Sequence, residues 1–251
     1  MNLKGKVALV TGGRRVGGDL AKTLAARGCH VAMTYHASRE IIEKTLAEVA
    51  SLGVKTFAVQ ADLADPDQAE RAVAETARAL GRLDILVNMA SIYRKTPFDS
   101  LKPADFQSLI AANLAGPYYT AVAAAKQMRL QSLDDGLQGK IVNVGDWATE
   151  RPYKDYLPYL VAKGGLTTMT LALAKELAPT VTVNLVQPAM IDPPPDFSQG
   201  DRDAVLALTP LKRLGSPNDL NEMILMLLEK TDFATGSCYR VDGGRFLGTD
   251  N

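Results

Sequence analysis

The sequence predicts an α/β fold in which a doubly wound parallel sheet of seven strands carries helices on both faces. Three observations lead to this prediction. Short apolar runs alternate with helical segments along the chain, which is typical of right-handed βαβ units. The first apolar run ends in Gly12-Gly13. No linker, repeat or low-complexity tract divides the 251 residues, so a single domain over residues 1–251 is expected.

The strands and helices are expected in strict alternation. The strands are expected at Lys6–Thr11, Val31–Tyr35, Val54–Val59, Leu83–Val87, Lys140–Val144, Val181–Val186 and Ser237–Val241. Helices are expected after Gly13, from about Glu40 to Leu52, after Pro66, from Pro103 to Leu130, from Tyr156 to Leu177 and from Asn218 to Leu228. Apolar, β-branched runs indicate the strands, and a period of about 3.6 residues indicates the helices.

One long segment, residues 189–216, shows little apolar periodicity and contains Pro193-Pro194-Pro195. Long loops in compact domains are usually functional and often close over a substrate. We therefore expect a substrate loop at about 189–216.

Composition excludes several classes of function. Lys+Arg and Asp+Glu are equal at 28 each, and no basic run is interleaved with aromatics, so no nucleic-acid partner is expected. No apolar run is long enough to span a bilayer, and the first residues lead into a strand rather than a signal peptide. A soluble, cytoplasmic protein without a membrane partner is expected. His30 and His36 are the only histidines, so no metal site is expected, and Cys29 and Cys238 are expected as buried free thiols.

The turn after the first strand is the first candidate site. In a doubly wound sheet, ligands bind at the carboxyl ends of the strands near the point where strand order reverses. Gly12 and Gly13 let the backbone approach a phosphate, and the next helix offers its N-terminal amides and positive dipole end. The context of strand, glycine turn and helix predicts a dinucleotide-binding, Rossmann-type domain.

The end of the second strand favours NADP over NAD. An acidic residue that would bind the ribose of NAD is absent, and His36, Ser38 and Arg39 stand there instead. These side chains, helped by Arg14, can donate to a 2′-phosphate. Ser38 can alternatively cap the helix that begins near Arg39. Asp62 can accept from the adenine amino group or serve as an ordinary turn residue.

Tyr159 and Lys163 form a candidate catalytic pair. They are four residues apart, so in a helix they lie one turn apart on the same face. A phenol has a pKa of about 10, and a neighbouring ammonium favours its charged form. Lys163 can thus make Tyr159 a proton donor and acceptor near neutral pH. Alone, the spacing is a weak signal, because a Tyr and a Lys four residues apart occur by chance on many amphipathic helices.

Together these residues resemble the short-chain dehydrogenase/reductase family from Lys6 to about Gly244. The motifs that carry the resemblance are Thr11-Gly12, Asp62-Leu63, Asn88-Met89-Ala90-Ser91, Asn113, Tyr159-x-x-x-Lys163, Asn184 with Pro188, and Val241-Asp242-Gly243-Gly244. The resemblance implies hydride transfer to or from a nicotinamide. Tyr159 is then the acid/base, Lys163 holds the nicotinamide ribose and lowers the pKa of Tyr159, and Asn113 supports a water that links Lys163 to solvent.

The glycine turn departs from the family pattern. Arg15-Val16-Gly17 takes the place of Gly-x-Gly, so an arginine replaces the middle glycine. This turn is similar to that of pteridine reductases, in which the arginine reaches past the pyrophosphate toward the substrate. Alternatively, Arg15 only neutralises phosphate charge.

Asp146 is the second departure, because most of the family has a serine thirteen residues before the tyrosine. An ionised carboxylate only accepts hydrogen bonds and would repel a tyrosinate. Asp146 should therefore stay protonated or face N–H donors such as those of a pterin, and pteridine reductases carry Asp at this position. A protonated Asp146 can also deliver a proton to a ring nitrogen. The alternative is a harmless replacement of serine in a ketone reductase.

Tyr93 follows the Asn-x-Ala-Ser motif and is a candidate platform for a flat substrate. Pteridine reductases have an aromatic residue here that lies over the pterin, although a surface tyrosine is an equally simple interpretation. The expected substrate contacts are Arg15, Tyr93, Asp146 and Tyr159. The expected cofactor contacts are Gly12, Arg14, Arg15, Gly17, His36, Ser38, Arg39, Asp62, Leu63, Asn88, Ala90, Ser91, Lys163 and Pro188.

Three functions follow from these residues. The leading hypothesis is an NADPH-dependent reductase of the pteridine reductase type that acts on a pterin or dihydrofolate. The alternative is a general carbonyl reductase, such as a 3-oxoacyl thioester or small-ketone reductase. The third is a non-catalytic NADP(H)-binding sensor, which would not need Tyr159, Lys163 and Asn113. Two long helices rich in Ala and Leu suit burial against partner chains, so a homotetramer is expected.

Overall fold

The computed structural model describes residues 1–193 and 197–248. Its seven parallel strands form one sheet in the order β3-β2-β1-β4-β5-β6-β7. The strands are β1 Val7–Thr11, β2 His30–Tyr35, β3 Thr56–Gln60, β4 Ile85–Asn88, β5 Gly139–Val144, β6 Val181–Pro188 and β7 Cys238–Val241. The predicted fold class is confirmed, and the strand ends differ from the predicted ones by a few residues.

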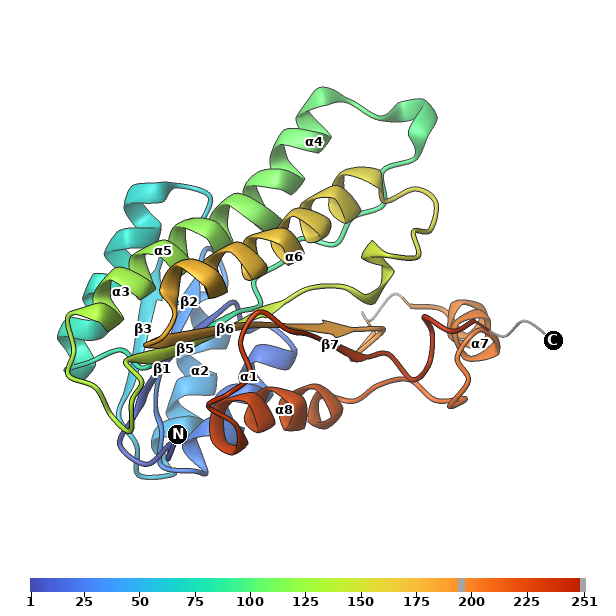
Figure 1. The fold of residues 1–251 in the computed structure, drawn as a ribbon. Helices are drawn as coiled ribbons and strands as arrows, with labels where there is room; N and C mark the ends of the chain where they lie inside the picture. The colour runs from blue at the N-terminus through green and yellow to red at the C-terminus, as the bar shows by residue number, and fades with distance from the viewer. Residues whose placement is uncertain (194–196, 249–251) are drawn as a thin grey trace.

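Helices connect the strands on both sides of the sheet (Figure 1). They are α1 Val16–Ala25, α2 Arg39–Ala50, α3 Pro66–Leu80, α4 Pro103–Ile110, α5 Gly116–Arg129, α6 Leu157–Leu177, α7 Gln199–Ala207 and α8 Pro217–Leu225. Short 3-10 turns lie at η1 Phe98–Ser100 and η3 Trp147–Thr149, and π-helical turns at η2 Ala111–Ala115 and η4 Met226–Lys230. None of these helices is long and apolar enough to cross a membrane, within the part of the chain that the structure describes.

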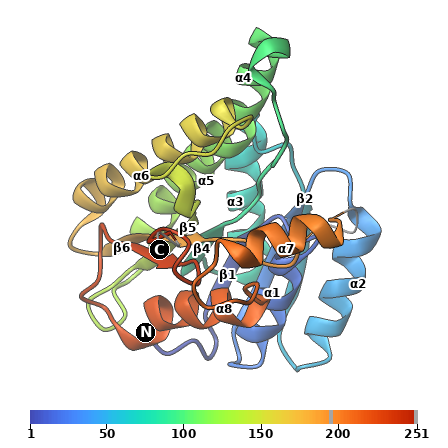
Figure 2. The ribbon, with the colours of Figure 1, turned by 90° about the vertical axis from the view of Figure 1, so that its right-hand side faces the viewer.

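The core consists of two apolar layers separated by the sheet. Helices α1, α2 and α8 pack on one face, and α3, α5 and α6 on the other (Figures 1 and 2). The strands of a sheet covered on both faces need apolar side chains on both sides. Accordingly, every residue of β1 is buried.

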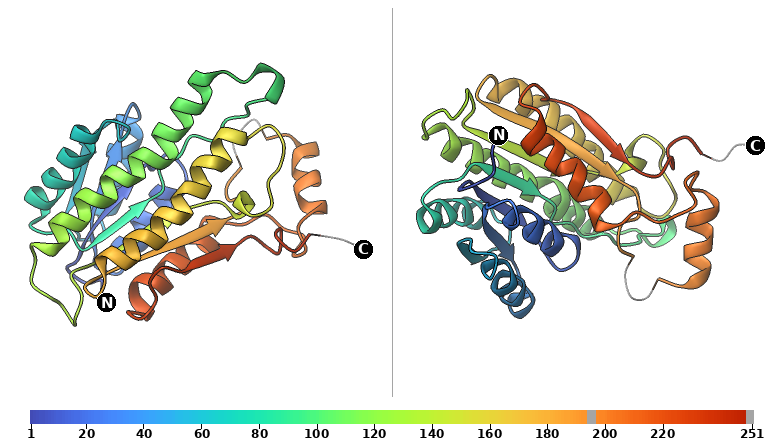
Figure 3. Two further views of the ribbon diagram at one scale, coloured as in Figure 1. Left: turned by 45° about the horizontal axis from the view of Figure 1, so that its top comes forward. Right: turned by 90° about the horizontal axis from the view of Figure 1, so that it is seen from below.

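The strand order fixes where a ligand can bind. Strand β1 has β2 on one side and β4 on the other, so the chain changes direction across the sheet after β3. A crevice at such a switch point, outside the carboxyl ends of the strands, is the usual ligand site of this architecture. Helix α7 and the C-terminal segment 242–248 lie beyond the carboxyl ends of β6 and β7 (Figures 1 and 3).

The helix predicted from Pro103 to Leu130 is interrupted in its middle. Helix α4 passes into the π-turn η2, and α5 continues to Arg129. Pro117 has no N–H, so it cannot donate to the carbonyl of Asn113 four residues earlier. The periodicity of the sequence did not reveal this turn, which carries Asn113.

The loop predicted at 189–216 contains the nine-residue helix α7. The Ser198 hydroxyl accepts from Asp201 N, and the Asp201 side chain accepts from Ser198 N. This capping box starts a helix that apolar periodicity did not indicate. Pro194 and Pro195 lie outside the described residues.

The expectation of two buried thiols is half wrong, because Cys29 is buried but Cys238 is exposed.

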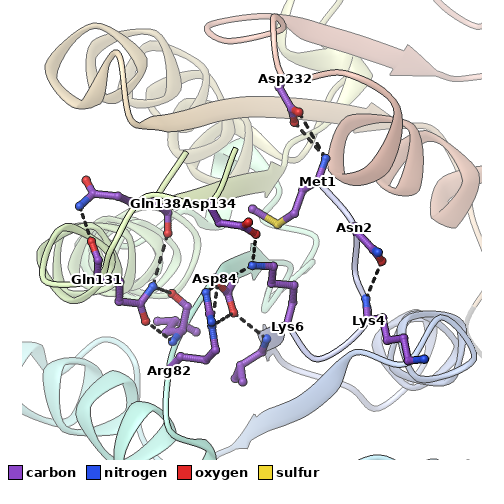
Figure 4. A network of polar contacts seen from close by, with 12 residues as sticks. Met1, Asn2, Lys4, Lys6, Arg82, Asp84, Gln131, Asp134, Gln138 and Asp232 are labelled. Atoms are coloured by element: carbon purple, nitrogen blue, oxygen red, sulfur yellow. Dashed lines mark hydrogen bonds and ion pairs between the residues drawn. The ribbon is translucent and has the colours of Figure 1, made fainter. Parts of the chain in front are cut away.

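Paired charges occupy the amino ends of the strands (Figure 4). Lys6 Nζ lies 3.8 Å from Asp84 Oδ1 and also pairs with Asp134. The guanidinium of Arg82 pairs with Asp84 at 2.6 Å. On the next strand, Lys140 is buried and pairs with Asp232 at 2.5 Å. Buried charges of this kind need partners, because an isolated ion away from water is costly.

Candidate active site

The site lies at the carboxyl end of β5 and the start of α6. Asp146 precedes the turn η3, and Tyr159 and Lys163 lie in the first two turns of α6. Tyr159 is 5% exposed and Lys163 is 3% exposed. Three ionisable side chains are therefore brought together in a place that largely excludes water.

Asp146 is hydrogen-bonded directly to Tyr159. The Tyr159 hydroxyl donates to Asp146 Oδ2 at 2.7 Å, and Ala148 N donates to Asp146 Oδ1 at 2.8 Å. Burial raises the pKa of Asp146, although both hydrogen bonds and nearby Lys163 oppose this rise. Burial also raises the pKa of Tyr159 well above its ordinary value, and the neighbouring Asp146 raises it further. The predicted lowering of the Tyr159 pKa by Lys163 is not seen in this arrangement.

Lys163 points its ammonium at the end of β5. Lys163 Nζ donates to the main-chain oxygen of Val144 at 2.8 Å and lies 5.9 Å from the centre of the Tyr159 ring. Burial lowers the pKa of Lys163 to about 8, while Asp146 acts in the opposite direction. Lys163 is thus close enough to influence Tyr159 and Asp146 electrostatically, but its hydrogen bond is to the backbone.

Asn113 fixes the loop that follows β4. Its side-chain oxygen accepts from Ser91 Oγ at 2.6 Å and Ile92 N at 3.0 Å. Its side-chain nitrogen donates to the main-chain oxygens of Ile92 and Leu109, both at 3.0 Å. These four bonds use the donors and acceptors of the amide. A water bound at Asn113 would therefore have to use its main-chain oxygen, which Pro117 leaves without the usual helical donor.

An arc of aromatic rings lines the side of the site toward solvent. Tyr93 stacks on Tyr156 with ring centres 4.5 Å apart and meets the edge of Tyr159 at 5.0 Å. Tyr153 meets Tyr156 edge-on at 5.1 Å and lies 6.3 Å from Trp147. Tyr93 is half-exposed, so one part of its surface is open to a ligand. The structure therefore brings the predicted Tyr93 to the catalytic pair.

In the glycine turn, neighbouring backbone segments lie close to Gly12 and Gly17. Gly12 has a φ of +72°, and a Cβ there would lie 3.1 Å from the Cα of Ala90. A Cβ at Gly17 would lie 2.7 Å from the main-chain oxygen of Gly12. Helix α1 begins at Val16, and no side chain caps its first turn. Gly18 N donates to Arg15 O at 3.3 Å, and the N–H groups before it have no helical acceptor and are available to an anion.

The charged residues predicted for the phosphates lie at the same end of the sheet. Arg14, Arg15, His36 and Arg39 are exposed, and Arg39 pairs with Glu43 at 2.8 Å. Arg15 Nη1 donates to the main-chain oxygen of Asp192 at 3.0 Å, so it already contacts the segment 189–193. Ser38 is at the N-cap of α2 but makes no side-chain capping bond.

Other predicted cofactor residues have structural partners. Asp62 Oδ1 accepts from Ala64 N at 3.0 Å, so Asp62 serves at least as a turn residue. Leu63 packs its main chain against Gly116, and Pro188 ends β6. These contacts place the residues at the rim of the crevice without assigning a ligand to them.

The side chain of Asn88 has structural partners of its own. Its side chain is buried, donates to Asn143 Oδ1 at 3.0 Å and to Pro117 O at 3.2 Å, and accepts from Thr120 Oγ1 at 2.8 Å. The amide is thus committed to the core between β4, β5 and α5. Only its main chain can lie along a cofactor.

Two residues of the site were not among those predicted. The Thr11 hydroxyl accepts from Met89 N at 3.1 Å and Ala90 N at 3.2 Å, which ties β1 to the end of β4. The ring of Tyr156 stacks on the ring of Tyr93. Tyr156 is the N-cap residue of α6 and lies just outside the helix, so its spacing of three from Tyr159 gave only an indirect signal. Thr11 was named only as part of the Thr11-Gly12 motif, and its bonds were not predicted because their partners are distant in sequence.

Comparison with known proteins identifies the family. A family model described as enoyl-(acyl carrier protein) reductase matches residues 13–245. A 3-oxoacyl-(acyl-carrier-protein) reductase of Synechocystis is 34% identical, with 98% of each chain covered. The corresponding reductase FabG of Staphylococcus aureus is 32% identical, with 96% of this chain and 98% of the relative covered. The chain belongs to the short-chain dehydrogenase/reductase family.

A solved relative extends the comparison to the structure. A short chain dehydrogenase from Burkholderia cenocepacia, crystallised in complex with NADP, superposes with a TM-score of 0.89 and 34% identity, covering 98% of this chain and 99% of that one. Membership of this oxidoreductase family is thus supported by sequence and by structure. The finer resemblance to pteridine reductases gains no support from these relatives, two of which are named for 3-oxoacyl reduction.

Proposed function

We propose that this protein is an NADPH-dependent reductase that adds hydride and a proton across a carbon–oxygen or carbon–nitrogen double bond of a small molecule. The observation that carries the proposal is the buried Tyr159 hydroxyl, which is bonded to Asp146 and lies beside Lys163 at the carboxyl end of the sheet. A non-catalytic NADP(H) sensor would have no use for this arrangement.

The residues present fit a dinucleotide phosphate. The uncapped start of α1 and the close approach of Gly12 to Ala90 suit a pyrophosphate, and His36, Ser38, Arg39 and Arg14 suit a 2′-phosphate. The NADP complex of the Burkholderia relative supports the same choice of cofactor. When bound, NADPH supplies the hydride.

The side chains of the protein would supply the proton that the substrate takes up. Tyr159 retains its proton in the folded protein, because burial and Asp146 raise its pKa. Its single hydroxyl proton points to Asp146 Oδ2, so a substrate atom must replace Asp146 as the acceptor before it can be protonated. The ammonium of Lys163 would then stabilise the phenolate that is left.

A 3-oxoacyl thioester or small ketone is the first candidate substrate. The names of the two 3-oxoacyl reductases support it, and their similarity extends over nearly the whole chain. A ketone oxygen can accept from Tyr159. A protonated Asp146 can donate a second hydrogen bond, as serine does in most of the family, and burial favours that protonated form by raising the pKa of Asp146.

A pterin or dihydrofolate is the second candidate. The observation in its favour is the acid at position 146 beside the half-exposed ring of Tyr93. Asp146 can exchange a proton with a ring nitrogen, and Tyr93 can stack on a flat heterocycle. The relatives do not support this substrate, so it rests on these side chains alone.

The variant Asp146→Ser separates the two candidates. Oxidation of NADPH would be followed with an acetoacetyl thioester, dihydrobiopterin and dihydrofolate as substrates. A ketone reductase should keep or gain activity with serine, whereas a pterin reductase should lose about 10²–10⁴-fold in kcat/KM, because its proton donor is gone. The exposed Asp99→Ser serves as the control. If NADPH binds but none of these substrates is consumed, the reductase proposal fails and the sensor remains.

A homotetramer is proposed for the assembly. The apolar side chains of Leu114, Tyr118, Val122, Met169 and Leu173 line a hollow of about 580 Å³ between α5 and α6. An apolar surface of this kind suits burial against a second copy. Light scattering at micromolar concentration should give four times the mass of the chain, and a monomeric mass would contradict the proposal.

A cytoplasmic location is proposed from the sequence alone.

A further inference from the structure

Arg245 lies against the catalytic turn although it is distant from it in sequence. It follows Gly243-Gly244 after the last strand, and segment 242–248 folds back toward α6. The Arg245 guanidinium carbon lies 5.2 Å from the centre of the Trp147 ring. Trp147 directly follows Asp146, and the next residue of the tail, Phe246, packs against the cluster that contains Trp147 and Tyr159. Arg245 is thus held at the edge of the proposed substrate pocket.

The same side chain contacts the substrate loop. Arg245 Nη1 donates to the main-chain oxygen of Val205 in α7 at 2.9 Å. The guanidinium therefore touches two elements that come together only in the folded protein, η3 and α7. A ligand that reaches the space between η3 and α7 would meet a donor group that is fixed in direction by Trp147 and Val205.

Arg245 has no carboxylate partner among the described residues, unlike several other arginines of the chain. Arg240 pairs with Glu150 at 2.8 Å, and Arg213 pairs with Asp219 at 2.7 Å. The nearby Asp242 is occupied, because its oxygens accept from Gly244 N and Phe246 N, both at 2.9 Å. Arg245 is only partly exposed, and burial lowers its pKa. A partly buried cation that no described carboxylate contacts directly favours the binding of an anion.

We infer that Arg245 is a specificity-determining residue that binds a carboxylate of the substrate, at a distance from the atom that Tyr159 protonates. The planar guanidinium fork matches a carboxylate, and four of its five N–H groups are not used by Val205. This inference rests on the proposed reductase function. It adds to that function a preference for acidic over neutral substrates.

The first test compares charged and neutral members of matched pairs, acetoacetate with methyl acetoacetate and dihydrofolate with its dimethyl ester. Arg245→Met keeps an unbranched side chain against Trp147 but removes the charge. In the pair that the wild type reduces, the variant should lose at least about tenfold in kcat/KM for the acid and less than about twofold for the ester, as expected for a lost charged hydrogen bond.

Arg240→Met is the matched control, because it removes a cation that stacks on Phe246 at 3.6 Å but is already paired with Glu150. It should leave the preference between acid and ester unchanged. An equal loss for acid and ester in Arg245→Met would show that Arg245 only holds α7 in place, and this result would overturn the inference. No loss for the acid would overturn it as well.

A second readout does not need turnover. Trp147 is the only tryptophan of the chain, so its fluorescence reports directly on the neighbourhood of Arg245. In the presence of NADP, acetoacetate or dihydrofolate should change the Trp147 emission of the wild type at lower concentration than the corresponding ester. Arg245→Met should remove this difference. If no substrate is reduced, the reductase proposal fails, and the titration still decides whether Arg245 binds a carboxylate.

Discussion

The two ends of the sheet bury ionisable groups in different ways. At the amino ends of the strands, Lys6 and Arg82 pair with Asp84 (Figure 4), and Lys140 pairs with Asp232. At the carboxyl ends, Lys163 is equally buried, but its hydrogen bond goes to the main chain of Val144. Paired charges hold elements together, whereas an unpaired buried cation with a displaced pKa is available for chemistry. The comparison therefore separates residues that serve the fold from residues for which we propose a role in a reaction.

The largest effect is expected at the carboxyl end. Tyr159→Phe removes the proposed proton donor but keeps the ring that packs in the aromatic arc. We expect kcat/KM to fall by about 10²–10⁴-fold, with a nearly unchanged free energy of unfolding. Steady-state kinetics and urea unfolding measure the two quantities. Tyr119→Phe on α5 is the control, and activity close to wild type in Tyr159→Phe would remove the proton-transfer role.

The next effect is expected at the amino end, with the opposite signature. The side chain of Asp84 is 2% exposed, accepts from Val7 N at 2.9 Å and pairs with Arg82 and Lys6. Asp84→Asn removes the carboxylate that pairs with Arg82 and leaves Lys6 with Asp134 alone, which should lower the free energy of unfolding by about 1–3 kcal/mol. The activity of the folded fraction should not change. A loss of activity without a loss of stability would contradict the division between the two ends.

The smallest effect is a pH dependence that differs between the ends. The pKa of Lys163 falls from its ordinary 10.5 to about 8 in the folded protein. Between these pH values the unfolded chain binds more protons, so Lys163 makes the free energy of unfolding rise with pH. Over the same interval kcat/KM should fall with a midpoint near pH 8, because the cation beside Tyr159 is lost. An activity that stays constant to about pH 10 would exclude this role of Lys163.

At the amino ends of the strands, the free energy of unfolding should depend on pH in the acid range. The Lys6 ammonium lowers the pKa of the Asp134 carboxyl below its ordinary 3.8. Its stabilising contribution is therefore complete above that value and is lost as the pH falls through the lowered pKa. Unfolding in urea at acid and alkaline pH, together with pH profiles of activity, separates the two titrations. The exposed Lys22→Met should leave both unchanged.

Much of the fold could be predicted because local patterns agree with the final architecture. Apolar runs became strands, and Gly12 and Gly17 mark a turn whose backbone leaves no room for a Cβ. Residues joined by short spacing, such as Tyr159 and Lys163, were also found together. The hydrogen bond between Tyr159 and Asp146 depends on how the end of β5 lies against the start of α6. The sequence linked these two residues only through the family resemblance.

Contacts between distant segments could not be predicted in this way. Arg245 meets Trp147 across 98 residues of sequence (245 − 147 = 98) because the tail folds back over η3. The commitment of the Asn88 amide to Thr120 and Asn143 depends on the packing of α5 against the sheet. Helix α7 was missed because its capping box, not an apolar stripe, marks its start.

The π-turn at Ala111–Ala115 sets a strict count of residues between α4 and α5. Each residue of a helix advances the side-chain direction by about 100°, so removing one residue here would restore an unbroken helix and turn α4 relative to α5 by that angle. Asn113 would then swing away from Ser91 and Ile92. A change of one residue in the length of this turn should therefore release the loop that borders the site.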